Sequence, residues 1–483
     1  MGLVLEKIDY KKVFYYFEEI SSIPRGSKNN KEISDYLVGF AKEHGLEYIQ
    51  DEFLNVIIIK EASKGKEHCE AVVLQGHMDM VCEKESDVMH DFTKEGLDLK
   101  IEGDFIHAKG TTLGADDGVA LAYALAILDG DYVHPRLEVI VTTDEETGME
   151  GATGLDTSML KAKYMLNLDS DEEEVLIVGC AGGMRSSFDL PVQYEEAQGI
   201  MLSVSVIGLY GGHSGTDINK NRTNATLLLS RLLFELQEEC TYSIIRMYGG
   251  SKDNVIPREA YADLVINESD QDLILSKITR LKETYQNELR GSEPNLDILV
   301  NLQQESNYQV LLADSLKKVL LLLLNTPNGI QVMSSNIENF VESSLNLGIF
   351  HIEDNKAHYS YSVRSSSASY KRYINHKLQL FAESMGCTYS TYGDYPAWEY
   401  REESKLKDLL VELYQQEFKR KPKVEAIHAG LECGIIASKM PGIDIVSLGP
   451  NTHDIHTPQE RLSISSAIRV FDYVIKILEK LCE

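Results

Sequence analysis

The sequence has few basic side chains for its number of acidic ones. Its 483 residues include 47 Lys and Arg against 76 Asp and Glu, which gives a formal net charge of −29 at pH 7. A surface with this excess of negative charge repels phosphate backbones and anionic lipid headgroups. We therefore expect neither nucleic acid nor a membrane as a partner, and a surface that tolerates cationic small molecules.

Long apolar runs and paired cysteines are also missing. The longest purely aliphatic run, Val319–Leu324, is far shorter than the ~20 residues that a membrane-spanning helix needs. The seven cysteines are scattered, no Cys-x-x-Cys pair occurs, and Met1–Asp9 has no basic and apolar signal pattern. These features predict a cytoplasmic protein without a disulfide framework.

Two common hydrolase motifs are absent. No His-Glu-x-x-His segment occurs, which excludes a zincin as far as motifs can exclude one. The nearest approach to a serine nucleophile elbow, around Ser214, has its second glycine one position early. A serine hydrolase of that type is therefore not expected.

The chain is too long for one hydrophobic core, since single cores stop growing near ~250–300 residues. Buried strands are predicted at Ala71–Leu74, Leu137–Val141 and Tyr164–Leu168, with an apolar helix at Gly118–Asp129. The same pattern of a buried strand followed by a helix recurs near the C-terminus, with a strand at Ile443–Leu448 and a helix at Ile464–Leu481. We expect an α/β domain with a mixed, mostly parallel sheet sandwiched by helices.

The middle of the chain has a different pattern. Polar and apolar residues alternate at Met201–Ile207 and Ala357–Val363, which predicts half-exposed antiparallel strands, and Asn224–Glu239 has the pattern of an amphipathic helix. The simplest interpretation is an α+β lid domain inserted into the α/β domain. The expected boundaries are 1–183 and 398–483 for the catalytic domain and 184–397 for the lid.

Acidic and imidazole side chains gather just past the predicted buried strands, where open α/β sheets bind ligands. Each one alone also has an ordinary structural explanation as a helix cap, a turn residue or a solvated charge. Their shared placement at strand ends is what favours a common site. The candidates after strands are His77, Asp79, Asp144–Glu146, Asp169 and Asn451–His456. Asp116 is expected to open the apolar helix after the glycine-containing loop 110–114, and could project into the same place.

This mixture of side chains suits a site with two divalent ions. Two such ions can share one carboxylate, polarise a carbonyl group and activate a water molecule. Imidazole and carboxylate ligands suit zinc, and also cobalt or manganese. A carboxylate that binds no metal can transfer the proton, and another can orient a metal-bound histidine.

Taken together, the motifs resemble the zinc dipeptidase/aminoacylase/carboxypeptidase superfamily. Further segments are similar to its aminoacyl-histidine dipeptidase (peptidase D) branch, and the similarity runs nearly end to end. The superfamily motifs are His77-Met-Asp79, Gly114-Ala-Asp116-Asp-Gly118, Asp144-Glu-Glu146, Asn167-Leu-Asp169 and His453–Glu460. The branch segments are Ser22–Arg25, Asn254–Glu259, Val341–Asn346 and His428–Gly434.

The resemblance implies a role for each catalytic position. Asp116 would bridge two zinc ions, with one site completed by His77 and Asp169. The second site would be completed by Glu146 and His456. Glu145 would be the general base, and Asp79 the carboxylate behind His77. Asp117 stands where many relatives have Asn, but this position is not a ligand.

The predicted lid and the C-terminal part supply substrate-binding candidates. His213, in Gly211–Gly215, resembles a lid histidine that contacts a substrate carbonyl or carboxylate, and Arg364 resembles an arginine that grips a carboxylate. Glu432 would anchor the substrate amine, and Asn254 is a weaker candidate. A glycine-rich turn, a strand-surface arginine and a helix start are the alternative explanations for the first three.

The resemblance implies hydrolysis of unblocked dipeptides, including Xaa-His dipeptides such as β-alanyl-histidine. An aminoacylase or a carboxypeptidase of the same superfamily remains an alternative, as does an inactive binding protein with this fold. A homodimer is expected, and the lid histidine could act in its own chain or in a partner.

Overall fold

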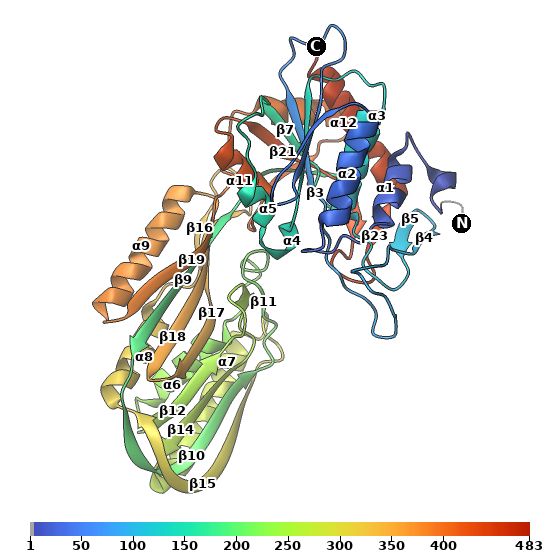
Figure 1. Cartoon of the computed structure of the whole chain (residues 1–483). Coiled ribbons are helices and arrows are strands. Elements are labelled where there is room, and N and C mark those ends of the chain that lie inside the picture. The colour runs from blue at the N-terminus through green and yellow to red at the C-terminus, as the bar shows by residue number, and fades with distance from the viewer. Residues whose placement is uncertain (1–3) are drawn as a thin grey trace. The chain divides into compact units, whose positions relative to one another are not determined.

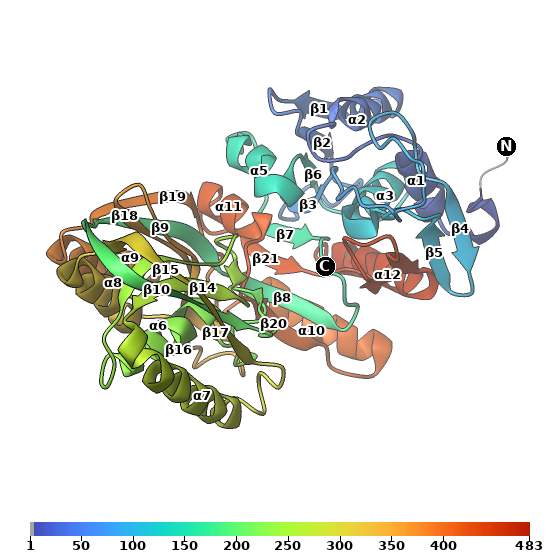
Figure 2. The same cartoon turned by 90° about the horizontal axis from the view of Figure 1, so that it is seen from below.

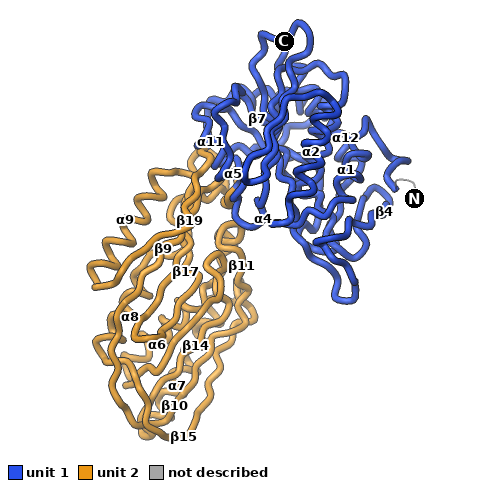
Figure 3. Tube along the Cα trace, in the orientation of Figure 1, with its two compact units in different colours: residues 1–179, 400–426, 431–483 blue, residues 180–399, 427–430 orange. Residues whose placement is uncertain are grey.

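The structure is a computed structural model that describes residues 4–483, and its contacts divide the chain into two compact units. Unit 1 contains residues 1–179, 400–426 and 431–483, and unit 2 contains residues 180–399 and 427–430 (Figure 3). A four-residue piece of the C-terminal region therefore belongs to unit 2. That the predicted catalytic and lid segments are independent domains stays a prediction.

Unit 1 is built around an eight-stranded sheet with the order β1-β2-β6-β3-β7-β21-β8-β20. Its bounds are β1 (Glu47–Gln50), β2 (Val56–Lys60), β6 (Leu137–Thr142), β3 (Val72–His77), β7 (Tyr164–Asn167), β21 (Asp444–Ser447), β8 (Val175–Cys180) and β20 (Lys423–Ile427). The four central strands β6, β3, β7 and β21 are parallel, while β1-β2, β2-β6 and β21-β8 are antiparallel. The mixed sheet predicted from the sequence is confirmed, with its parallel part at the centre.

Helices cover both faces of this sheet. Figure 2 shows α3 and α12 on one side and α5 and α11 on the other. The bounds are α1 (Val13–Ser21), α2 (Lys31–Glu43), α3 (Ala115–Asp129), α4 (Glu145–Gly148), α5 (Glu150–Gly154), α10 (Lys405–Phe418), α11 (Glu432–Lys439) and α12 (Ile464–Lys480), with a 3-10 turn η1 (Glu6–Ile8). Nearly every residue of α3 is buried, as its apolar composition predicts. The Ser463 hydroxyl caps α12 by accepting a hydrogen bond from the Ser466 N–H.

A small four-stranded sheet, order β22-β23-β5-β4, is also part of unit 1 and has no counterpart in the sequence analysis. Its strands are β4 (Leu99–Glu102), β5 (Phe105–Ala108), β22 (Thr452–His453) and β23 (Arg461–Ser463). The pairs β22-β23, β23-β5 and β5-β4 are all antiparallel. The sheet ties the loop 454–460 to a segment some 350 residues earlier in the chain, and this loop carries His456 and Glu460.

Unit 2 contains an antiparallel sheet of nine strands, with the order β15-β10-β14-β12-β17-β18-β9-β19 and β16 beside β17 (Figure 1). The strands are β9 (Gly182–Pro191), β10 (Tyr194–Ile207), β12 (Ser243–Gly249), β14 (Ala260–Ile266), β15 (Asp297–Leu311), β16 (Gly329–Met333), β17 (Val341–Glu353), β18 (Lys356–Ser365) and β19 (Thr388–Tyr395). A separate short pair joins β11 (Gly212–His213) to β13 (Val255–Ile256). The helical elements are α6 (Ala225–Leu236), η2 (Glu268–Asp270), α7 (Gln271–Glu288), α8 (Ala313–Asn325) and α9 (Ala368–Ser384).

Burial corrects one expectation about unit 2. The strand predicted at Ala357–Val363 is β18, but it is buried along almost its whole length instead of half-exposed. Tyr359, Tyr361 and Val363 belong to the hydrophobic core of the unit. Small serines alternate with them, and β18 lies between β17 and β9. The alternation of polar and apolar residues in β18 therefore reflects two buried faces of the strand, one lined by serines and the other by apolar and aromatic side chains.

Among the described residues, no helix is both long enough and apolar enough to cross a membrane. None of the seven cysteines forms a disulfide in this part of the chain.

Candidate metal centre and substrate-binding residues

The carboxyl ends of β3, β6, β7 and β21 meet at one edge of the unit 1 sheet, because these neighbouring strands are parallel. β3 ends at His77, and α4 begins at Glu145 just after β6. Asp169 follows the end of β7, and His456 comes from the loop between β22 and β23. The predicted residues of unit 1 are thus brought to the same edge.

Asp116 lies between two histidines. Its Oδ1 is 3.0 Å from Nε2 of His77, and its Oδ2 is 3.2 Å from Nε2 of His456. Nε2 of His77 is also 3.7 Å from Oδ1 of Asp169, and Nε2 of His456 is 3.0 Å from Oε1 of Glu146. The donors form two groups that share Asp116, and within each group the donor atoms lie within 4.8 Å of one another.

The charges in this cluster interact strongly. Burial raises the pKa of Asp169 well above its usual range, and neighbouring Asp117 adds to the effect. Burial also works against ionisation of Asp116, but hydrogen bonds with His456 and His77 outweigh it and lower the pKa of Asp116. Hydrogen bonds to Asp116 and Glu146 raise the pKa of His456 to about 10. Close carboxylates of this kind draw positive charge, and the oxygen and imidazole donors fit zinc, cobalt or manganese.

Asp79 holds His77 from behind. Nδ1 of His77 is 3.1 Å from the Asp79 carbonyl oxygen and 3.4 Å from its Oδ1. Oδ2 of Asp79 accepts a hydrogen bond from the Ser27 hydroxyl at 2.7 Å, and Oδ1 accepts one from the Glu145 N–H at 3.1 Å. His77 and Asp79 are both fully buried. Asp79 therefore fixes the imidazole of His77 and the backbone of Glu145 together.

Glu145 is not a member of the two groups that share Asp116. It does form a third group of possible donors with His77 and Glu146. Burial raises the pKa of Glu145 to about 8, with His77 acting in the opposite direction and Glu432 adding to the rise. Its carboxyl group is thus close enough to the cluster to act on it, either as a base or as a ligand.

Two residues without a role in the sequence analysis hold the segment that carries Asp116. The Glu460 carboxylate accepts hydrogen bonds from four consecutive backbone N–H groups, those of residues 113, 114, 115 and 116, at 2.8, 2.9, 2.8 and 3.4 Å. The Arg25 guanidinium donates to the carbonyl oxygens of Met78 and Asp79 at 3.0 and 3.1 Å, and to that of Gly114. Both side chains are almost completely buried.

Arg25 and Glu460 lie in two segments that resemble the family, Ser22–Arg25 and His453–Glu460, but neither residue is assigned a role by that resemblance. The only sequence feature that could have indicated their roles is a charged residue inside a segment that resembles the family. Their partners are backbone groups, which are the same at every position of a sequence. Asp116 and Asp117 themselves have non-helical backbone angles, so the regular helix starts after them. The expectation that Asp116 opens the helix needs this correction.

Glu432 begins α11 and is completely buried. Its Oε2 accepts hydrogen bonds from Gln75 and from the Thr142 hydroxyl, each at 2.6 Å, whereas Oε1 has no hydrogen-bond partner among residues 4–483. Burial raises the pKa of Glu432 to about 7. No sequence pattern connects Gln75 and Thr142 with this carboxyl group.

In unit 2, His213 and Arg364 are in contact. A guanidinium nitrogen of Arg364 is 3.2 Å from Nε2 of His213, and a second one donates to the Tyr395 hydroxyl at 2.9 Å. Burial, followed by the charge of Arg364, lowers the pKa of His213 to about 4, so the imidazole is neutral and accepts from the guanidinium. Asn254 is tied to the same region through its carbonyl oxygen, which accepts from the Ser214 N–H at 2.8 Å.

Comparison with known proteins identifies the family of the chain. The family described as Peptidase family M20/M25/M40 matches residues 73–483. The chain belongs to this peptidase family. Its members are metal-dependent, which agrees with groups of His, Asp and Glu that could hold an ion in unit 1.

Relatives of this M20-type peptidase extend over its whole length. It is 36% identical over 480 residues to the cytosol non-specific dipeptidase of Escherichia coli (strain K12), a match that covers 99% of each chain. The crystal structure of aminoacylhistidine dipeptidase from Vibrio alginolyticus matches with a TM-score of 0.90 and 34% identity, covering 97% of this chain and 96% of that one. Aminopeptidase PepT from Bacillus cereus, at 17% identity and a TM-score of 0.56, shares the fold.

Proposed function

We propose that this peptidase hydrolyses unblocked dipeptides with the help of two metal ions. The observation that carries the proposal is the pair of donor groups His77–Asp116–Asp169 and Asp116–Glu146–His456, which share one carboxylate. Each group offers three protein donors, one imidazole and two carboxylates, and catalytic zinc sites likewise use three protein ligands and keep one position open. Zinc is the proposed metal, and cobalt or manganese would suit the same donors.

When bound, the ions would polarise the scissile carbonyl and lower the pKa of a water molecule. The protein's own residues do the rest. Glu145 is the proposed general base, which takes a proton from water and gives it to the leaving amine. The hydrogen bond from its backbone N–H to Asp79 supports this role, because it fixes the start of α4 relative to His77. Asp79 keeps the His77 ring in one orientation.

His213 and Arg364 are the proposed binding groups for the substrate carboxylate. A guanidinium presents a planar pair of donors that matches a carboxylate, and its contact with Tyr395 holds it in place. Asn254 is proposed as a further polar contact near His213. Glu432 is proposed to anchor the substrate ammonium group, which its unpartnered Oε1 supports.

Recognition of both substrate termini would select dipeptides. A longer peptide would leave one buried charge without a partner, which is costly. The two relatives have names of different breadth, one a non-specific dipeptidase and the other an aminoacylhistidine dipeptidase. We propose that Xaa-His dipeptides are one part of a wider range of dipeptide substrates.

A comparison of free and blocked substrates tests the proposal. Metal-loaded protein should cleave free dipeptides, including β-alanyl-histidine, and leave tripeptides and N-acetyl amino acids nearly untouched. Cleavage of N-acetyl amino acids with dipeptides untouched would instead assign an aminoacylase activity. Absence of any hydrolysis by metal-loaded protein would favour the inactive binding protein.

Two further expectations stay proposals. The cytoplasm is the proposed compartment, which the name of the cytosolic Escherichia coli relative supports. A homodimer is the proposed assembly, and sedimentation of the purified protein at two concentrations would test it.

A further inference from the structure

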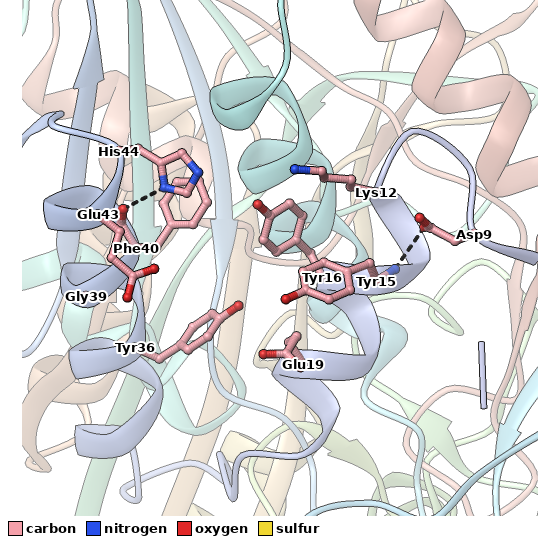
Figure 4. Close-up of a pocket in the computed structure, with 10 residues that line it drawn as sticks. All are labelled: Asp9, Lys12, Tyr15, Tyr16, Glu19, Tyr36, Gly39, Phe40, Glu43 and His44. Carbon is pink, nitrogen blue, oxygen red and sulfur yellow. Dashed lines mark hydrogen bonds between the residues drawn. The ribbon is translucent and has the colours of Figure 1, made fainter. Parts of the chain in front are cut away.

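A hollow of about 630 Å³ lies between α1 and α2 of unit 1, and Figure 4 shows its lining. Its volume falls within the ~300–1,000 Å³ that is usual for small-molecule sites. None of its residues belongs to the candidate metal centre. The lining residues are Asp9, Lys12, Tyr15, Tyr16, Glu19, Tyr36, Gly39, Phe40, Glu43 and His44.

The walls of this hollow are largely aromatic. The rings of Tyr15 and Tyr16 meet edge to face at 5.1 Å, and Tyr16 meets Phe40 edge to face at 5.6 Å. Tyr36 reaches from α2 toward the α1 side chains (Figure 4). The faces of such rings carry negative partial charge and attract cations.

The one cation on the wall is already paired. Lys12 forms an ion pair with Asp129, whose carboxylate also accepts a hydrogen bond from the Tyr16 hydroxyl at 3.0 Å. Nε2 of His44 lies 3.1 Å from the same carboxylate. Asp129 therefore neutralises Lys12. No other lysine or arginine among the described residues lines the hollow, so none is available to pair with its glutamates.

Four polar groups of the lining have no hydrogen-bond or ion-pair partner among the described residues. They are the carboxylates of Glu19 and Glu43 and the hydroxyls of Tyr15 and Tyr36. Burial, with further contributions from Glu19, Tyr15 and Glu43, raises the pKa of Tyr36, so its hydroxyl keeps its proton and can donate to a carboxylate. Two unpaired negative charges thus stand beside aromatic faces.

We propose that this hollow binds a small organic ammonium ion, such as an alkyl diamine. The hydrocarbon part packs against the tyrosine and phenylalanine rings, and the ammonium groups pair with Glu19 and Glu43. A metal cation such as Mg²⁺ fits less well, because it requires an octahedral shell of oxygen ligands that aromatic rings cannot supply. An anion is disfavoured by the two unpaired carboxylates.

Isothermal titration calorimetry on the full-length protein tests the site. Putrescine and tetramethylammonium chloride are titrated separately, with NaCl and MgCl₂ at matched ionic strength as reference titrations. We expect saturable binding of putrescine at one site per chain, and no comparable binding of Na⁺ or Mg²⁺. Because the site is independent of the metal centre, dipeptide hydrolysis is measured in parallel and should not change in the variants.

Three variants test the carboxylates and the Tyr36 ring separately. Glu19→Gln/Glu43→Gln should weaken putrescine binding by at least about tenfold, or about 1.4 kcal/mol, since it removes both carboxylates that pair with the ammonium groups. Tyr36→Leu should weaken binding of tetramethylammonium, while Tyr36→Phe should retain it, because the ring survives. The matched control is Glu305→Gln/Glu338→Gln, which removes two exposed, unpaired carboxylates from unit 2.

The outcomes separate a built site from general attraction to an acidic protein. Equal binding by Glu19→Gln/Glu43→Gln and by the control would overturn the proposal. Stoichiometric Mg²⁺ binding that the same double variant abolishes, with amines silent, would overturn it in favour of a metal site. Glu19 and Glu43 have no partners to lose, so the thermal unfolding midpoint of the double variant should match that of the control.

Discussion

Replacing Glu460 by glutamine should loosen the segment that carries Asp116. The carboxylate accepts four backbone N–H groups with its two oxygens. Glutamine keeps one oxygen, which can serve two of these N–H groups, and places an NH₂ group against the other two. Leaving a buried donor without an acceptor costs about 1–3 kcal/mol, so the loss should amount to about 2–6 kcal/mol. That is a large part of the ~5–15 kcal/mol that stabilises a typical folded protein.

The assay has two readouts. Urea unfolding in the presence of a chelator reports the free energy of unfolding without metal, and competition with a chromophoric chelator reports zinc affinity. We expect both to fall, and zinc affinity to fall by at least about tenfold, because 1.4 kcal/mol of disturbance at Asp116 is enough for that. Loss of stability alone would indicate a purely structural role.

The matched control is Glu479→Gln, an equal loss of one carboxylate at an exposed position of α12. Surface changes of this kind are usually within ~0.5 kcal/mol of neutral. If Glu460→Gln lies within that range in unfolding free energy and matches the control in zinc affinity, the four hydrogen bonds do not hold the metal segment, and the reasoning fails.

The remaining predictions concern the metals, the proposed base Glu145 and His213. Chelation should abolish hydrolysis and zinc, cobalt or manganese should restore it; fewer than one divalent ion per active chain in elemental analysis would refute a two-ion site. Glu145→Gln should keep its metal content but lose kcat by several orders of magnitude, since it removes proton transfer; loss of the metal instead would make Glu145 a ligand. His213→Ala should lower kcat far more than metal content. A kcat equal to that of the unmodified protein would mean that Gly211–Gly215 is only a glycine-rich turn. Because burial and Arg364 lower the pKa of His213 from 6.5 to about 4, the unfolded state binds the proton first, so unfolding free energy should fall as pH drops from 6.5 toward 4. In His213→Asn, the slope of unfolding free energy against pH in this range should be smaller, by an amount equivalent to the uptake of at most one proton on unfolding.

The parallel strands and their clusters could be predicted because both leave local marks. A buried parallel strand is a short apolar run, and β3, β6, β7 and β21 each lie within one to three residues of their predicted bounds. Polar residues directly after such runs must lie at the same sheet edge. The placement of His77 and Asp169 at one edge therefore follows from sequence position and sheet topology. Asp116 follows none of these strands, so its place beside them does not follow from the same reasoning.

Contacts between distant segments could not be predicted in the same way. Glu460 meets N–H groups almost 350 residues away, and Arg25 meets carbonyl oxygens 53 to 89 residues away. Backbone groups are the same at every position, so neither interaction has a complementary residue that a reader of the sequence could find. The prediction that β18 is half-exposed was wrong for a related reason. An alternating serine does not reveal whether its face of the sheet is covered by other residues or exposed to solvent.

The candidate metal centre is assembled from segments that the fold must first bring together. His77 depends on Asp79, which depends in turn on Ser27, and Asp116 depends on Glu460 and Arg25. Ions that bind these positions only in the folded chain stabilise it by mass action, with about 2.7 kcal/mol gained at a free concentration of 100 times the dissociation constant. The positions held by Glu460 and by the loop of His456 should gain most, because there the ion adds a further link between remote parts of the chain. If the proposed ions bind here, metal binding and the integrity of the 113–116 segment form one coupled equilibrium, so the Glu460 variant is to be measured both with and without metal.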